Sequence, residues 1–140
     1  MKRVAALRQL SDDHHQGLVL ALRAKKAADG KDGLSVDAIW AEVVQRFADE
    51  LEPHFQIEER YLAPALLDVG EIQLVQRLHQ EHAALRELLE ATDHSAASLR
   101  EFGQMLAQHI RFEERELFEA AQQLLSSRTL DAIATADSKS

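Results

Sequence analysis

The chain has 140 residues, 46% of them hydrophobic and 29% charged, which is typical of a single globular domain and too apolar for a disordered chain. Its formal net charge of −8 argues against nucleic-acid and anionic-lipid partners, which need a basic surface. It has no cysteine, which excludes disulfides, iron–sulfur clusters, thiolate zinc sites and cysteine nucleophiles, so any metal would be bound by nitrogen and oxygen atoms.

Helix-forming residues dominate, and the first half of the chain predicts two long helices. The first ten residues carry charges and no long apolar run, so we expect no signal peptide or membrane anchor and a cytoplasmic location. The first helix is predicted over residues 2–28, followed by a loop with two glycines at residues 29–33. The second should cover residues 35–69, with Ser35 as its N-cap and Gly70 as its end; Pro53 should kink or interrupt it.

The second half predicts two more long helices and a short one. They are expected over residues 71–91, 96–125 and 129–134, with a polar turn at residues 92–95. Long helices with short connections favour an all-α fold, an antiparallel up-down-up-down four-helix bundle with a short fifth helix near the C-terminus. We therefore expect one domain over residues 1–135 and a loose tail over residues 136–140.

One pattern, His-x-x-x-Glu-Glu-Arg, occurs twice, as HFQIEER from His54 and as HIRFEER from His109. On a helix, four residues turn about 40° past a full circle and climb ~6 Å, so each His and the Glu four places later share one face. These pairs are His54 with Glu58 and His109 with Glu113. An imidazole and a carboxylate stacked in this way can bind one metal, and two such pairs can bind two.

The other histidines extend this candidate site to all four long helices. Leu18 and Leu22 follow His15 at the same steps at which two leucines follow His82, so we predict that His15 faces inward and that His14 flanks the site. The whole inward-facing set is predicted to be His15, His54, Glu58, His79, His82, His109 and Glu113. Five imidazoles and two carboxylates are too many ligands for one metal and suit two bridged metals.

A simpler interpretation has to be weighed, because a single histidine on an apolar face is usually an ordinary core residue. The two glutamates favour the metal site, since Glu58 and Glu113 stand among apolar residues and would be costly to bury without a partner. The Glu-Arg pair that follows each of these glutamates is interpreted as forming surface ion pairs; the alternative is that these residues orient the metal ligands. They are Glu59, Arg60, Glu114 and Arg115. His94 is expected to be a solvated turn residue.

These segments resemble the hemerythrin-like (HHE cation-binding) family over about residues 5–126. The resemblance is carried by DDHHQGL, EPHFQIEERYLAP, LHQEHAALRELL and QHIRFEERELF, in that order. It implies a four-helix bundle around a non-haem di-iron centre, in which two iron ions share two carboxylates and an oxo or hydroxo bridge. Carried onto this chain, Glu58 and Glu113 are the bridges, and the terminal ligands are His15, His54, His79, His82 and His109.

Two departures from the oxygen-carrying hemerythrins stand out. His79 and His82 are three residues apart rather than four, which leaves open whether both bind metal. Glu113 follows His109 at four residues, where the oxygen carriers have an Asp at five. The second change is usual in the wider HHE group.

The implied ligand set leaves an open coordination position and is rich in nitrogen, which disfavours high-valent iron. We therefore expect a protein that binds or senses oxygen, nitric oxide or iron rather than an enzyme. The alternatives are a di-iron redox enzyme that reduces peroxide or oxidises ferrous iron, or a bundle stabilised by zinc or manganese. The expected partner is a small diatomic ligand or peroxide, and the sequence leaves any protein partner unidentified. Because imidazoles must be neutral to bind metal, affinity should fall below pH ~6.

Overall fold

Four long helical segments and a shorter C-terminal helix make up the computed structural model, which describes residues 3–138. The first long segment is α1 (Ala5–Ala28), and the third is α5 (Ile72–Glu90). The second consists of α2 (Val36–Arg46), the π-helical turn η1 (Phe47–Leu51), α3 (Glu52–Ile57), the π-helical turn η2 (Glu58–Leu62) and α4 (Ala63–Asp68). The fourth consists of α6 (Ala96–Phe112), the π-helical turn η3 (Glu113–Leu117) and α7 (Phe118–Leu124), and α8 (Ser127–Ser138) follows it.

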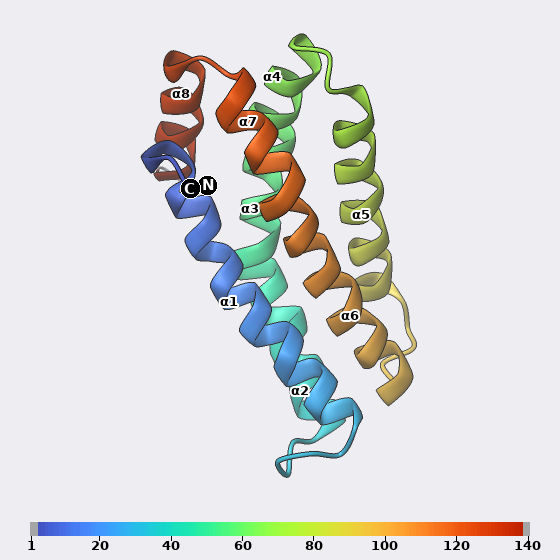
Figure 1. The fold of residues 1–140 in the computed structure, drawn as a ribbon. Coiled ribbons are helices and arrows are strands. Elements are labelled where there is room, and N and C mark those ends of the chain that lie inside the picture. Colours follow the sequence, from blue (N-terminus) through green and yellow to red (C-terminus); the bar gives the residue numbers. More distant parts are fainter. Residues whose placement is uncertain (1–2, 139–140) are drawn as a thin grey trace.

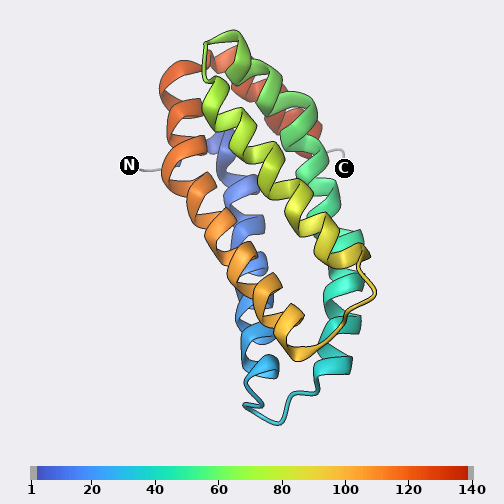
Figure 2. The ribbon, with the colours of Figure 1, turned by 90° about the vertical axis from the view of Figure 1, so that its right-hand side faces the viewer.

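The long segments lie side by side as a helical bundle, and the chain reverses its direction at each connection between them (Figures 1 and 2). α8 lies outside these segments at one end of the bundle, where it contacts α1, α3 and η2. The bundle interior is therefore formed by the four long segments, with α8 as an outer cover.

Most helix ends agree with the sequence predictions. The Ser35 hydroxyl accepts a hydrogen bond from the backbone N–H of Ala38, which confirms the predicted N-cap, and Gly70 adopts a φ of +89° just beyond α4. α8 runs from Ser127 to Ser138 and is longer than the predicted 129–134; Leu130 and Ile133 are buried against the bundle, and Ala136, beyond the predicted end, packs against the same cluster. The predicted loose tail begins at residue 136, whereas α8 reaches Ser138; residues 139 and 140 lie outside the described residues.

Pro53, where a kink or interruption was predicted, lies at a change from π-helical to α-helical structure, and the second long segment continues past it. It occupies the second position of α3, directly after the π-helical turn η1, and Pro64 follows η2 in the same way. A proline cannot donate to the carbonyl four residues earlier and collides with it. A π-helical turn shifts the hydrogen bonds to a spacing of five residues and so makes room for the ring. The helix therefore continues through both prolines.

The interior holds two apolar clusters, one at each end of the bundle. One cluster includes Leu20 and Leu85, and the other includes Leu10 and Leu78. Along α1 and α5, a buried histidine falls between the two clusters. Buried charge is thus confined to the middle of the bundle. Within residues 3–138, no helix combines the length and the apolar composition needed to cross a membrane.

Candidate metal centre

Both copies of the repeated segment have the same local structure. Glu58 begins η2 and Glu113 begins η3, and each carboxylate is fully buried. The histidine one turn earlier faces it as predicted: His54 Nε2 is 3.1 Å from Glu58 Oε2, and His109 Nε2 is 2.8 Å from Glu113 Oε2. π-helical turns of this kind are frequent at functional sites. No proline follows Glu113 within η3 or α7, so the turn there has a different origin from the two that precede prolines.

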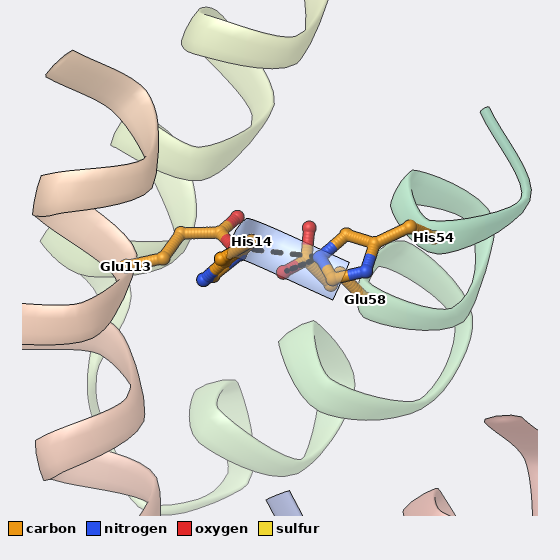
Figure 3. Close-up of side chains that lie close together, drawn as sticks. All are labelled: His14, His54, Glu58 and Glu113. Carbon is orange, nitrogen blue, oxygen red and sulfur yellow. Dashed lines mark hydrogen bonds and ion pairs between the residues drawn. The ribbon is translucent and has the colours of Figure 1, made fainter. Parts of the chain in front are cut away.

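Two further histidines complete two groups of ligand atoms that share both glutamates. The first group is His14, His54, Glu58 and Glu113 (Figure 3), and the second is Glu58, His82, His109 and Glu113. His14 Nε2 lies 2.7 Å from Glu113 Oε1, and His82 Nε2 lies 3.1 Å from Glu58 Oε1. In each group the ligand atoms all lie within 4.8 Å of one another, and all six residues are buried.

The second group contains four buried polar atoms that form no well-directed hydrogen bond among residues 3–138. They are Nε2 of His82, Nε2 of His109, Oε1 of Glu58 and Oε2 of Glu113. They contact one another as ion pairs, His82 with Glu58 at 3.1 Å and His109 with Glu113 at 2.8 Å. Native structures seldom leave buried polar atoms without hydrogen bonds unless there is a reason. All four atoms can act as lone-pair donors and face the same small space, as the ligands of a cation would.

A ring of outer carboxylates holds the four histidines from the other side. Each lies within hydrogen-bond distance of an Nδ1 atom, and each comes from a helix other than that of its histidine. The Nδ1-to-oxygen distances are 2.6 Å for His14 with Glu114, 3.1 Å for His54 with Asp13, 2.6 Å for His82 with Glu59 and 2.7 Å for His109 with Glu81. In this tautomer the Nδ1–H group donates a hydrogen bond to the carboxylate, and the lone pair of Nε2 faces the centre, where it can bind metal.

The outer carboxylates are fixed in turn by a third layer of donors. Arg86 donates to Glu59, and Arg77 donates to Glu81. In the same way Gln9 donates to Asp13, while Ser11 and Arg3 donate to Glu114. The orientation of every imidazole is therefore determined by contacts that extend to the surface of the bundle.

The electrostatics of the centre favour positive charge. Burial alone would lower the pKa of His82, but close contacts with the carboxylates of Glu113, Glu58 and Glu59 outweigh it and raise that pKa to about 10. For His109, the charge of Glu113 outweighs burial and raises the pKa to about 9. Burial would raise the pKa of Glu113, yet the charge of His109 and the hydrogen bonds of the Glu113 carboxylate hold the pKa of Glu113 well below its usual value. Without metal, protons supply the positive charge that these carboxylates require.

The structure brings together five of the seven predicted site residues, namely His54, Glu58, His82, His109 and Glu113. It contradicts the inward orientation predicted for the other two, because His15 and His79 are exposed and belong to neither group. His14, which was expected to flank the site, takes the place predicted for His15. The centre therefore contains four imidazoles rather than five.

Close packing of α1 against α6 explains the error in α1. The buried positions near His14 are occupied by Gly17 and Ala21, while the leucines that suggested the inward face, Leu18 and Leu22, are 37% and 50% exposed. A Cβ atom built on Gly17 would lie 2.8 Å from Cδ1 of Ile110. The part of α1 that faces α6 thus has small residues at Gly17, Ala21 and Ala24, because the two helices approach closely there, while Leu7, Leu10 and Leu20 fill the rest of the buried face.

For α5 the reason is simpler: the buried stripe contains Leu78, His82 and Leu85, and His79 lies one residue outside it.

The outer carboxylates were only partly anticipated. Glu59 and Glu114 were interpreted as surface ion pairs, yet each is half-buried and supports a histidine; hydrogen bonds from His82 and Arg86 outweigh burial and lower the pKa of Glu59 to about 2. Asp13 and Glu81 were missed. The only signal for them in the sequence is that each directly precedes a ligand histidine.

A cavity of about 550 Å³ extends from the metal centre toward α8. Its walls include His14, His54 and His109 at the inner end, and residues of α1, η1, α6 and α8 elsewhere. A molecule or ion in this cavity could reach residues of both ligand groups.

Comparison with known protein families gives one match. A family model described as "Hemerythrin HHE cation binding domain" matches residues 6–121, which include all six residues of the two groups. Neither a comparison with curated proteins nor one with solved structures gave a match.

Proposed function

Because the chain belongs to the hemerythrin HHE cation-binding family, we propose that its two ligand groups hold two iron ions and that it binds or senses oxygen, nitric oxide or iron there. His14 and His54 would hold one ion, His82 and His109 the other, and Glu58 and Glu113 would be shared by both. We further propose that the long segments form an antiparallel up-down-up-down four-helix bundle and that the protein works in the cytoplasm.

One observation carries the proposal: two groups, each with two imidazole nitrogens and two carboxylates, share both carboxylates at the centre of the bundle. A structural core histidine needs only one partner, whereas here four Nε2 atoms converge on two buried glutamates. The outer carboxylates agree with metal ligation, and so do the buried atoms of the second group that form no well-directed hydrogen bond.

The donor atoms restrict the metal and its chemistry. Imidazole and carboxylate ligands without thiolate suit iron, manganese, zinc or copper, and two histidines with carboxylate and open positions are typical of ferrous iron. When bound, the two irons would supply reversible binding of small ligands or one-electron chemistry. With one imidazole fewer than predicted, the site leaves more coordination positions to water or a ligand.

A di-iron redox enzyme remains a second candidate, and the cavity is the observation that favours it. A diatomic ligand does not require a space of about 550 Å³ beside His54 and His109. The oxidation of ferrous iron would use such a space, because a hydrated cation is larger than a diatomic ligand. The nitrogen-rich ligand set still favours binding or sensing, because neutral imidazoles add no negative charge to stabilise high-valent iron.

Metal content and the visible spectrum test the proposal together. The metal-free protein is given ferrous iron anaerobically, exposed to air and then degassed. Two irons per chain and a coloured form that bleaches on degassing would support reversible oxygen binding, whereas two irons that oxidise once and stay oxidised would favour the redox enzyme. Fewer than two metals per chain would refute the two-metal site, and tight binding of zinc with no affinity for iron would favour a structural role.

A further inference from the structure

We propose that the cavity beneath α8 is the path by which hydrated divalent cations, ferrous iron above all, reach the metal centre. The inference rests on the proposed function and adds the route and the charge of what travels along it. The cavity lies between α1, η1, α3, α6 and α8, and its inner end is formed by His14, His54 and His109. It therefore opens onto ligands of both groups.

The charges on its walls favour a cation. Outside the histidines of its inner end, four carboxylates line it, namely Asp13, Asp49, Glu50 and Asp137, against one guanidinium, that of Arg46. Asp13 contacts His54, and Arg46 forms ion pairs with Glu50 and Glu42, so the acidic charge of the outer walls rests on Asp49 and Asp137. Carboxylates on the outer walls of a cleft attract cations and speed their association. The positive charge of the protonated histidines lies at the inner end, where the arriving metal displaces the protons.

The other surroundings of the ligands are less suited to a cation. The ligand residues are at most 5% exposed, and apolar clusters lie on both sides of them along the bundle. A smaller hollow of about 260 Å³ lies over α5 and α6, but its walls include Arg77, Arg111 and Arg115 and no ligand residue. Glu116 also lines this hollow and pairs with Arg77, but the guanidinium groups of Arg111 and Arg115 leave it less favourable for a cation.

α8 forms one wall of the path through Ala134 and Asp137. This helix lies outside residues 6–121, the span that the family model matches. It contributes a carboxylate to the cavity and narrows it, without contributing a ligand to either group. The C-terminal helix thus shapes how cations approach a centre that the matched part of the chain builds.

The test is the rate of Co²⁺ uptake by the metal-free full-length protein, followed by stopped-flow absorbance at low and high ionic strength. Asp49→Asn and Asp137→Asn each remove one charge from the walls. Asp131→Asn is the matched control, because Asp131 is exposed on α8 and does not line the cavity. At low ionic strength we expect uptake to slow by about three- to tenfold in both wall variants and to stay unchanged in the control. The difference should shrink at high salt.

A fourth variant separates the shape of the path from its charge. Ala134→Leu should narrow the cavity and slow uptake equally at low and high ionic strength. Circular dichroism and the equilibrium stoichiometry of two Co²⁺ per chain show that each variant still folds and binds. Equal rates in wild type and all four variants, or equal slowing in the wall variants and the control, would overturn the path. A wild-type chain that binds fewer than two Co²⁺ at equilibrium would instead refute the proposed function.

Discussion

Replacing His14 by alanine should remove one ligand of the first group and leave the second group complete. Its Nε2 atom lies 2.7 Å from Glu113 Oε1, and its Nδ1 atom lies 2.6 Å from Glu114 Oε2. Loss of a residue that only orients a ligand lowers metal affinity 10–100-fold, so loss of the ligand itself should lower the affinity of the first group by at least about 100-fold, or about 2.7 kcal/mol. At low micromolar metal the variant should bind about one ion per chain.

The neighbouring His15→Ala variant is the control, because it makes the same chemical change one residue away on the exposed face of α1. Isothermal titration and elemental analysis of the loaded proteins give the stoichiometry and affinity, and circular dichroism checks folding. The His14 variant should also lose stability without metal, since its imidazole stacks on Phe118 and holds two carboxylates. Full metal binding by His14→Ala together with loss by His15→Ala would refute the placement of α1.

Three other perturbations test other parts of the centre. Glu113→Gln should weaken the binding of both ions, because both groups share that residue. Elemental analysis that still finds two tightly bound ions would contradict a bridging role. Glu81→Gln should lower the metal affinity of the second group alone, by about 10–100-fold, because Glu81 orients His109. Competition with a chromophoric chelator measures this affinity, and His79→Ala on the same helix should leave it unchanged. In the metal-free protein protons occupy His82 and His109, whose pKa values are about 10 and about 9, so metal must displace them. Affinity should therefore keep rising from pH ~6.5 to ~9, well above the window expected for ordinary imidazoles, and an indicator dye should record protons released on binding; a flat profile over that range would count against these ligands.

The second and fourth long segments could be predicted from the sequence because their signal is local. Two residues four apart on one helix share a face whatever the rest of the chain does, so the pairs His54 with Glu58 and His109 with Glu113 followed from spacing alone. Leucine stripes and turn residues placed the helices in the same way. The placement of these two pairs therefore agrees with the structure, whereas the leucine stripe and the three-residue spacing misplaced His15 and His79.

The inward face of α1 depends on the distance between two helices, which spacing within one helix does not report. Leucines usually mark a buried face, but α1 packs against α6 through glycine and alanine and leaves Leu18 and Leu22 exposed. The small residues at Gly17, Ala21 and Ala24 were the available signal, since they continue from His14 at steps of three and four. A stripe of small residues should therefore be interpreted as a buried face where a second helix also has a small residue at the contact. Gly103 of α6 is such a residue, since it packs against Ala21 and Ala24 of α1.

The outer carboxylates show why a metal centre of this kind extends beyond its ligands. Asp13, Glu59, Glu81 and Glu114 each stand next to a ligand in the sequence and contact the histidine of another helix, so the ring links all four long segments. Without metal, the raised histidine pKa values mean that this ring stabilises the fold fully below the unfolded pKa of ~6.5 and loses that contribution as pH rises through about 9 to 10. Bound cations replace the protons and remove that loss. The same charges that orient the ligands thus make the metal-free bundle dependent on protons and the loaded bundle dependent on metal.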